Sequence, residues 1–547
     1  MLYMIYLHSL QLLPSRSNFQ GLTSPHSARG DQTVTVRGPA MASSVLLVAS
    51  ATALLALGLR RGAPPVAAPR RGRHVQGAGG PRAALQVSQG QQPRRQEDEG
   101  GGRCASAGRP RPQLSPQGGP FLYWFGPQPR ICLLDYESVR QVLFNKSGHF
   151  FKIDAHPTIL ALLGKGLVLV EGTDWVRHRR VVNPAFAMDK LKTMTTTMVS
   201  CAEPLIKEWE RLASSNESRE VEVEFSKLFQ DLTADIISHT GFGSSYKQGK
   251  EVFHTQRQLL ALAVATLLNV QLPGLKYLPT KNNRLKWMLD KKIKTMLMAI
   301  IQPRLASNGG GYGDDLLGLM LEACLTTEQG EKGDELTLTL TMDEIIDECK
   351  TFFFAGHETT SRLLTWTMFL LSVYPEWQER LREEVLRERG KENPTADMLN
   401  KFKEMTMVLL ETLRLYTPVM VMLRKPISDI RLGSLSIPKG NGIAIPIPFL
   451  HRDKEVWGDN ANDFDPLRFE NGITNAAKTP QALLSFSIGP RSCIGQNFAM
   501  LEAKSVMAMI LKKFSFTLSS SYVHAPADHI TLQPKFGLPI VLRPLDV

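Results

Sequence analysis

The spacing of apolar residues predicts a mostly α-helical chain with a smaller β portion. Over residues 136–420, apolar positions recur at the interval of three to four residues that is typical of helices. Short runs that are typical of strands lie on either side, at residues 121–125, 130–134, 430–437 and 442–447. The first two are expected to pair around the turn at Gly126-Pro127. The C-terminal segment also has the pattern of strands and turns, and no internal repeat is visible. We therefore predict one folded domain over residues 119–547.

A separate apolar segment precedes this domain. Residues 40–59 contain no charged residue and are rich in Ala, Leu and Val, which matches the length that spans a hydrocarbon core. Arg60 and Arg61 follow at once, and positive charge at this end predicts that the following domain stays in the cytosol. We expect a transmembrane anchor, and a cleaved signal peptide is the alternative. Residues 1–39 form an extension without a clear pattern.

Composition changes the interpretation of residues 60–118. This segment contains eleven arginines and three acidic residues, so it carries most of the net charge of +12. It is rich in Gly, Pro and Gln and has almost no apolar periodicity, which is typical of a disordered linker. The rest of the chain is only mildly basic, which gives little support to nucleic-acid binding. The six cysteines show no disulfide spacing, as expected for a reducing compartment.

The strongest chemical signal is Cys493 in the stretch Phe486-Ser-Ile-Gly-Pro-Arg-Ser-Cys-Ile-Gly. Gly489 and Gly495 permit a tight hairpin around the cysteine. An apolar helix is predicted directly afterwards, and its positive N-terminal end favours a thiolate. No second cysteine lies at the spacing of a zinc site or a redox pair, so an axial bond to haem iron fits best. A lone cysteine is more often structural, but the residues around it make that alternative weak.

This stretch resembles the Phe-x-x-Gly-x-Arg-x-Cys-x-Gly signature of the cytochrome P450 haem-thiolate monooxygenases, and the resemblance extends from about residue 121 to the C-terminus. It implies the cytochrome P450 fold, haem b as the cofactor and Cys493 as the iron ligand. It also implies that NADPH supplies electrons through NADPH-cytochrome P450 reductase. Further residues that the resemblance places at the cofactor are Trp175, Arg179, Arg424, Phe486, Gly489, Arg491 and Gly495. The arginines suit the two haem propionates, and core packing is the alternative for Trp175.

A long apolar helix is predicted over residues 343–371, with the polar stretch Ala355-Gly-His-Glu-Thr-Thr at its centre. A glycine and polar side chains are unfavourable in a buried helix, and threonine hydroxyls can bend the backbone. We expect a local opening there. The stretch matches a second family motif, which implies that Glu358 and Thr359 form the acid–alcohol pair that delivers protons to dioxygen. An ordinary polar patch is the alternative for the motif taken alone.

Two more matches concern the fold rather than the chemistry. Glu411 and Arg414 lie three residues apart on a predicted apolar helix and match the family's Glu-x-x-Arg motif. Arg468, in Pro466-Leu-Arg-Phe, matches the third member of this structural group, although Leu467 replaces the glutamate most often seen. A solvated surface pair is the alternative for the first two residues. If the pair is buried, breaking one side would cost roughly 3–5 kcal/mol.

The substrate and the partners are implied only in outline. The stretches expected to line the pocket are nearly all apolar, which favours a small lipophilic or amphipathic molecule; they are residues 155–163, 353–359 and 419–423 and the turn near Phe536. Core packing explains them equally well. Cationic residues expected to form a basic rim for the reductase are Arg177, Arg180, Lys512 and Lys513. A solvated helix face is the alternative for the two arginines.

The residues within and next to these motifs resemble those of a clan of plant enzymes. This clan includes cytokinin trans-hydroxylases, gibberellin oxidases and fatty-acid subterminal hydroxylases. We therefore predict a monooxygenase anchored in the endoplasmic reticulum membrane, with a cytosolic domain that inserts one oxygen atom from O2 into a C–H bond. Two alternatives remain. One is haem-thiolate isomerisation or dehydration without O2, and the other is a non-catalytic product of a damaged gene, since residues 62–118 lack the amphipathic helix that the family carries there.

Overall fold

The computed structural model describes residues 119–546, except residues 127, 146–147, 244–245, 268–273, 307–310, 314, 326–339 and 390–392. The predicted extension, transmembrane anchor and linker, at residues 1–39, 40–59 and 60–118, lie outside the described residues. Within the described part of the chain, no helix combines the length and the apolar character that a membrane span requires.

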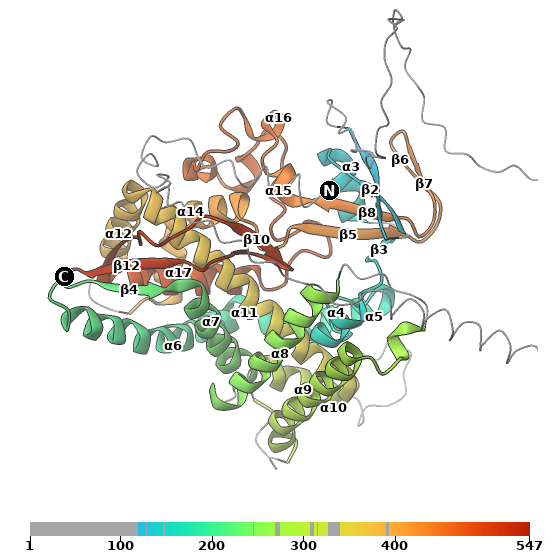
Figure 1. The fold of residues 1–547 in the computed structure, drawn as a ribbon, viewed down its shortest axis with the longest axis horizontal. Coiled ribbons are helices and arrows are strands. Elements are labelled where there is room, and N and C mark those ends of the chain that lie inside the picture. Colours follow the sequence, from blue (N-terminus) through green and yellow to red (C-terminus); the bar gives the residue numbers. More distant parts are fainter. Residues whose placement is uncertain are drawn as a thin grey trace, which may run out of the picture. The chain divides into compact units, whose positions relative to one another are not determined.

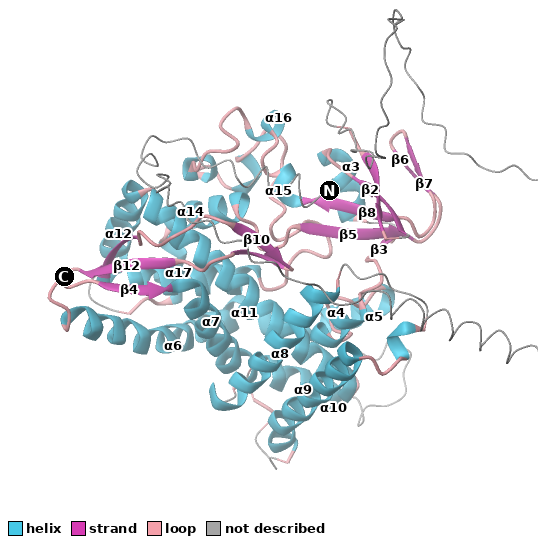
Figure 2. Ribbon diagram, viewed as in Figure 1, coloured by secondary structure: helices cyan, strands magenta, loops and turns pink. Residues whose placement is uncertain are grey.

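Helices make up most of the structure, and the strands gather in smaller sheets (Figures 1 and 2). The α-helices are α3 (Tyr136–Phe144), α4 (Pro157–Leu163), α5 (Gly172–Val182), α6 (Met188–Ser214), α7 (Phe225–Phe242), α8 (Tyr246–Thr266), α9 (Lys281–Leu305), α10 (Leu316–Leu325), α11 (Met342–Val373), α12 (Pro375–Arg389), α13 (Ala396–Lys401), α14 (Lys403–Leu415), α15 (Ile447–Leu450), α16 (Lys454–Trp457) and α17 (Gln496–Lys513). The predicted fold class, mostly α with a smaller β portion, is confirmed.

The strands are β1 (Phe121–Phe125), β2 (Gln128–Cys132), β3 (Phe150–Phe151), β4 (Val221–Glu224), β5 (Val421–Pro426), β6 (Ile430–Leu432), β7 (Leu435–Ile437), β8 (Gly442–Pro446), β9 (Phe514–Leu518), β10 (Pro526–His529), β11 (Thr531–Pro534) and β12 (Pro539–Pro544). The largest sheet has the order β1-β2-β8-β5-β3. As the sequence predicts, β1 and β2 pair antiparallel, with Phe121 opposite Cys132. Strands β4, β12 and β9 form a second sheet near the C-terminus.

Helix α11 runs through the helical layer and packs along α7 (Figure 1). It begins with a capping box, in which Thr341 and Glu344 satisfy each other's backbone N–H groups. At Gly356 the two helices approach closely, because an added Cβ would lie 2.9 Å from Cδ1 and from Cγ1 of Ile237. The hydroxyl of Thr233 on α7 also donates to the carbonyl of His357, at 2.9 Å. Gly356 therefore serves helix packing, a role that the sequence analysis did not assign to it.

Two apolar cores support the structure. The larger core is formed by helices such as α6, α7, α11 and α17, and the smaller one lies against the five-stranded sheet. Phe486 packs against the first core, and Ile488 is buried in the second. Met500, in the first turns of α17, packs against both. The loop between Phe486 and α17 therefore lies where the two cores meet, and both cores fix its position.

Candidate active site

Cys493 lies in a tight hairpin directly before α17. Its backbone N–H donates to the carbonyl of Phe486 at 2.8 Å, and the N–H of Ser492 donates to the carbonyl of Gly489 at 3.1 Å. Gly489 has a φ of +77°, and a Cβ there would lie 2.7 Å from the carbonyl oxygen of Leu143. Only glycine fits this position. The predicted hairpin is confirmed.

The surroundings of the Cys493 sulfur suit a thiolate that binds a metal. The residue is exposed on the hairpin, but desolvation by neighbouring protein atoms raises the pKa of its thiol overall. The N–H of Gly495 and the charge of Arg179 oppose this increase, and they are the groups that would stabilise a thiolate. Arg179 is held in place by donating to the carbonyl of Ser492 at 3.1 Å. Gly495 is also the N-cap of α17, so the positive end of that helix faces the loop.

A cluster of cations lies beside the hairpin. The guanidinium of Arg491 stacks 4.6 Å from the ring centre of Trp175 and donates to the carbonyl of Val170 at 3.0 Å. Burial, with help from the neighbouring Arg491, lowers the pKa of Arg424 to about 10. The structure adds Lys152, whose pKa is lowered to about 7 by burial first and then by the two arginines. The sequence analysis missed Lys152, because nothing in its local sequence distinguishes it from a surface lysine.

The charges of this cluster fit the haem propionates. Arg424 and Arg491 line a cavity of about 240 Å³ together with Trp175 and Glu171. Glu171 forms an ion pair with Arg491 and accepts from the backbone N–H of Lys152. Two arginines and the partly protonated Lys152 thus share one carboxylate among the described residues. Buried cations need anionic partners, so the carboxylates of the propionates would stabilise them there.

Glu358 lies in a closed ion pair rather than beside the hydroxyl of Thr359. Its Oε1 accepts from Nη2 of Arg362 at 2.7 Å and from the hydroxyl of Thr531 at 2.6 Å, and both charged residues are only 2% exposed. Burial by itself would raise the pKa of Glu358, but the charges of Arg362 and His357 outweigh it and lower the pKa. The carboxylate is therefore ionised and fully engaged. Its proton-delivery role remains a prediction.

Thr359 is on the more accessible side of α11. Its hydroxyl donates to the carbonyl of Ala355 at 2.8 Å, as expected for a threonine that bonds back to the preceding turn. Ala355, Gly356 and Thr359 are the partly accessible positions in this stretch, whereas Phe353 and His357 are buried. The accessible residues form the face on which a small ligand can reach the hydroxyl.

The predicted structural group around Glu411 is present. Glu411 and Arg414 are both fully buried and are joined by two hydrogen bonds of 2.7 Å. Arg468 lies 3.7 Å from the same carboxylate and donates to the carbonyl of Trp457 at 2.6 Å. Leu467 is 46% exposed, so its replacement of the usual glutamate leaves this group intact. The alternative of a solvated pair is wrong.

The residues that were expected to line the substrate pocket differ in burial. Phe353 is fully buried and stacks on Phe242 with the ring centres 3.9 Å apart, so it belongs to the core. Phe536 is 60% exposed. Residues 155–163 comprise all of α4 and the two residues before it, and the carbonyl of Leu163 accepts from the hydroxyl of Thr351 on α11. Helix α4 therefore packs against α11 at the buried Thr351.

Two of the cations that were predicted to form a basic rim for the reductase are paired with carboxylates. Arg177 is engaged by Glu344 through two hydrogen bonds of 2.9 and 2.5 Å. The ammonium of Lys513 binds Glu210 at 2.9 Å. Arg180 remains an exposed cation on α5. The rim is therefore less positive than the sequence suggested.

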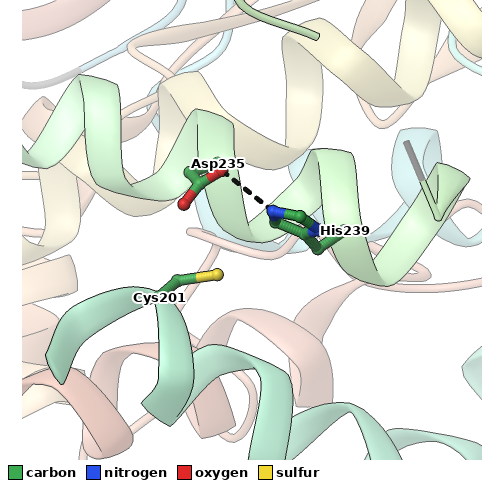
Figure 3. A group of neighbouring side chains, drawn as sticks. All are labelled: Cys201, Asp235 and His239. Atoms are coloured by element: carbon green, nitrogen blue, oxygen red, sulfur yellow. Dashed lines mark ion pairs between the residues drawn. The ribbon is translucent and has the colours of Figure 1, made fainter. Parts of the chain in front are cut away.

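A further cluster of polar side chains was missed by the sequence analysis. Cys201 on α6 faces Asp235 and His239, which lie one turn apart on α7 (Figure 3). Their potential ligand atoms lie within 4.8 Å of one another. Burial raises the pKa values of the Cys201 thiol and the Asp235 carboxyl, which hydrogen-bond to each other. The hydrogen bond between Cys201 and Asp235 and the 3.3 Å contact of Asp235 with His239 account for the cluster. The i,i+4 spacing of Asp235 and His239 was the available sequence signal.

The hairpin that presents a single cysteine sulfur, together with a cation cluster that suits two propionates, defines a haem-thiolate protein. The comparison with known proteins makes this specific: the Cytochrome P450 family model matches residues 113–539. The chain belongs to the cytochrome P450 family. It is a cytochrome P450 monooxygenase, an oxidoreductase.

Plant members of this family are similar to most of the chain. Cytochrome P450 709B1 of Arabidopsis thaliana is 48% identical over 438 residues, which are 79% of this chain and 83% of the relative. Cytochrome P450 734A6 of Oryza sativa subsp. japonica is 43% identical over 433 residues, which are 78% of this chain and 80% of the relative. Secologanin synthase 1 of Catharanthus roseus is 41% identical over 425 residues, which are 77% of this chain and 80% of the relative.

Proposed function

We propose that this monooxygenase hydroxylates a small lipophilic or amphipathic molecule, such as a fatty acid or a hormone of the cytokinin type, with electrons from NADPH through NADPH-cytochrome P450 reductase. The overall reaction takes one C–H bond, one O2, NADPH and one proton to an alcohol, water and NADP+. The apolar character of α4 and of the accessible face of α11 supports a lipophilic substrate. The cation Arg180, near the thiolate hairpin, supports a negatively charged redox partner.

The residues of this chain have separate tasks in the proposed reaction. Haem iron supplies the redox chemistry that activates dioxygen when it is bound. Cys493 would hold the iron from the hairpin, and the Gly495 N–H and Arg179 would stabilise its negative charge. Arg424 and Arg491 would hold the propionates. The hydroxyl of Thr359 passes a proton from the accessible face of α11, and Glu358, which is bonded to Arg362 and Thr531, is its partner in the proposed pair.

One observation carries the proposal: the hairpin fixes a single sulfur between the N-terminus of α17 and Arg179. Cys493→Ser should therefore remove the strong red shift of the Soret band that a thiolate-ligated haem shows when it is reduced and exposed to carbon monoxide. Hydroxylation should fall with it, because the sulfur donor is lost. A variant that kept both the red-shifted band and full turnover would contradict the assignment.

We also propose that residues 40–59 anchor the protein in the endoplasmic reticulum membrane with the catalytic domain in the cytosol. The support is the apolar length of that segment and the arginines that follow it. Deleting residues 1–59 should move the protein from the microsomal to the soluble fraction. Extraction of the full-length protein by alkaline carbonate would show that this segment does not span the bilayer.

A further inference from the structure

A buried carboxyl on α17, the helix that follows the Cys493 hairpin, lacks a hydrogen-bond partner. Glu502 is 0% exposed, and neither of its carboxyl oxygens has a partner in the part of the chain that the structure describes. An ionised carboxylate is strongly unfavourable in such surroundings, so the group keeps its proton. Burial accordingly raises the pKa of Glu502 well above the ordinary value of 4.5, and the nearby hydroxyl of Thr360 opposes this effect only in part.

The hydroxyl of Thr360 connects this acid with the oxygen side of α11. It gives its own hydrogen to the carbonyl of Gly356, at 3.2 Å. Its oxygen can therefore accept the hydrogen of Glu502. Gly356 and Thr359 are both partly accessible, so a proton that leaves Thr360 on the side of Gly356 reaches the face on which Thr359 lies.

The resting state of Glu358 gives this connection a purpose. The carboxylate of Glu358 is ionised and bonded to Arg362 and Thr531. A proton for Thr359 therefore needs a source that is still protonated. Glu502 is a neutral acid beside the same stretch of α11, and it meets this need.

A half-exposed group of side chains lies between Glu502 and solvent. It consists of Cys201, Asp235 and His239, and we call it the thiol cluster (Figure 3). Helix α6, which carries Cys201, packs along α17. Burial raises the pKa of the Cys201 thiol first, and the charges of Asp235 and Glu502 add to this effect. The side chains of Asp235 and His239 are 21% and 38% exposed, so solvent reaches the outer end of the cluster.

We propose that Glu502 passes protons through the hydroxyl of Thr360 to the accessible face of α11, and that the thiol cluster returns protons to it from solvent. The proposal rests on the proposed function, because Thr359 receives these protons. The O–H bond of Glu502 breaks and a bond forms to the oxygen of Thr360, whose own hydrogen moves on to the accessible face. The carboxylate then takes the hydrogen of Cys201, and the thiolate is reprotonated from solvent through Asp235. One proton enters for each that leaves, and no electron moves.

The first test determines whether Glu502 is a neutral acid in the folded protein. The infrared spectrum of the full-length holoenzyme at pH 7.0 should contain the carbonyl-stretch band of a protonated carboxyl, and Glu502→Gln should remove it. The haem propionates contribute equally to both spectra, so the difference reports on this side chain. A difference spectrum without that band would show an ionised carboxylate and overturn the proposal.

The second test measures the share of consumed O2 that is released as hydrogen peroxide, with NADPH, the reductase and dodecanoic acid as a probe. Glu502→Gln should raise this share several-fold, because peroxide leaves when the proton that helps to split the O–O bond is not delivered. Glu502→Asp keeps an acid and should lie closer to the parent. A packing role predicts the reverse order, since glutamine matches the shape of glutamate better than aspartate does.

Ser505→Ala is the matched control on α17. It removes a fully buried hydroxyl that bonds only to the carbonyl of Leu501 on its own helix, at 2.8 Å, and should leave the peroxide share unchanged. An equal increase in Ser505→Ala and Glu502→Gln would assign the effect to a distorted helix and refute the proposal. An unchanged share in Glu502→Gln would refute it directly.

Variants of the neighbouring groups test the route if the Glu502 variants fold poorly. Thr360→Val removes the hydroxyl and should raise the peroxide share, whereas Thr360→Ser keeps it and should resemble the parent; equal shares would exclude this hydroxyl. Cys201→Ala should also raise the share, and an unchanged value would refute the thiol cluster as the way to solvent. The carbon monoxide band should keep its full strength in all these variants, so failure of the route is distinct from failure of the proposed function.

Discussion

At the scale of single residues, two neighbours on α11 have opposite surroundings. The hydroxyl of Thr359 bonds only to the preceding turn of its own helix and lies on the accessible face. The carboxylate of Glu358 is buried and is bonded to Arg362 and Thr531. The first residue can therefore change with little effect on folding, whereas the second belongs to a buried charge network.

Thr359→Ala should lower the yield of hydroxylated product per NADPH several-fold and release the remaining electrons as hydrogen peroxide, because the hydroxyl that passes the proton is gone. Stability should change by less than about 1 kcal/mol. Product, peroxide and NADPH are measured in one assay. Thr365→Ala removes the same kind of bond one to two turns further along, from Thr365 to the carbonyl of Ser361, and should leave the coupling unchanged. An unaltered product yield in Thr359→Ala would exclude the assigned role.

At the scale of elements, one imidazole joins α14 to the segment that leads into the Cys493 hairpin. The backbone N–H of Leu484 donates to Nε2 of His451 at 2.8 Å, so Nε2 carries no proton. Nδ1 then donates to the carbonyl of Arg414 at 3.0 Å. Burial, with help from the charge of Arg414, lowers the pKa of His451 to about 3. The folded protein keeps this side chain neutral.

This arrangement predicts a pH dependence of stability. Below the ordinary histidine pKa of 6.5 the unfolded chain takes up a proton at His451 and the folded chain does not, until the pH approaches 3. Stability is therefore full above pH 6.5 and declines as the pH falls through that window, by up to about 1.4 kcal/mol per pH unit. Urea titrations at pH 7.5 and 5.0 should show a smaller decline in His451→Gln than in the parent. Equal declines would show that another group is responsible.

Local signals predicted the parts of the site that depend on nearby residues. The hairpin follows from Gly489 and its neighbours, and the Glu411–Arg414 pair follows from a helical spacing of three. Partners from distant segments could not be predicted in this way. Glu358 and Arg362 are four residues apart on α11, so their pairing follows from helical spacing, but Thr531 meets both of them only because β11 folds back onto α11.

The sequence could not separate pocket residues from core residues for a similar reason. Phe353 and Phe536 are both apolar residues in stretches expected to line the pocket, yet one stacks on Phe242 and the other is exposed. The period of a helix shows that one face is apolar, but the neighbouring elements decide which partner that face meets. Strand pairing was easier, because β1 and β2 are joined by a short turn.

At the scale of the whole molecule, the thiolate hairpin lies where the helical core and the sheet-side core meet. Helix α5 reaches the same place, since Arg179 bonds to Ser492 beside Cys493. The next residue, Arg180, is exposed, whereas Arg177 is already neutralised by Glu344. A redox partner that approaches the thiolate therefore meets fewer unpaired cations than the sequence suggests. Arg180 should then contribute a larger share of the electrostatic attraction.

Arg180→Glu should raise several-fold the reductase concentration that gives half the maximal rate, because it reverses a charge at the docking face. The difference should shrink at high salt, as expected for an exposed interaction. Reduction by dithionite, which needs no docking, should be unaffected. Arg431→Glu, an exposed arginine on β6, is the matched control. Loss of reductase activity in both variants alike would point to net charge rather than to a docking face.

The crossing of α7 and α11 also constrains how this sequence can diverge. Alanine at position 356 would collide with the outer carbons of Ile237, whereas the Cβ of residue 237, at 3.6 Å, would be in ordinary contact. A side chain at position 356 therefore requires the Ile237 side chain to shift or to become smaller. The two positions are expected to vary together among related sequences.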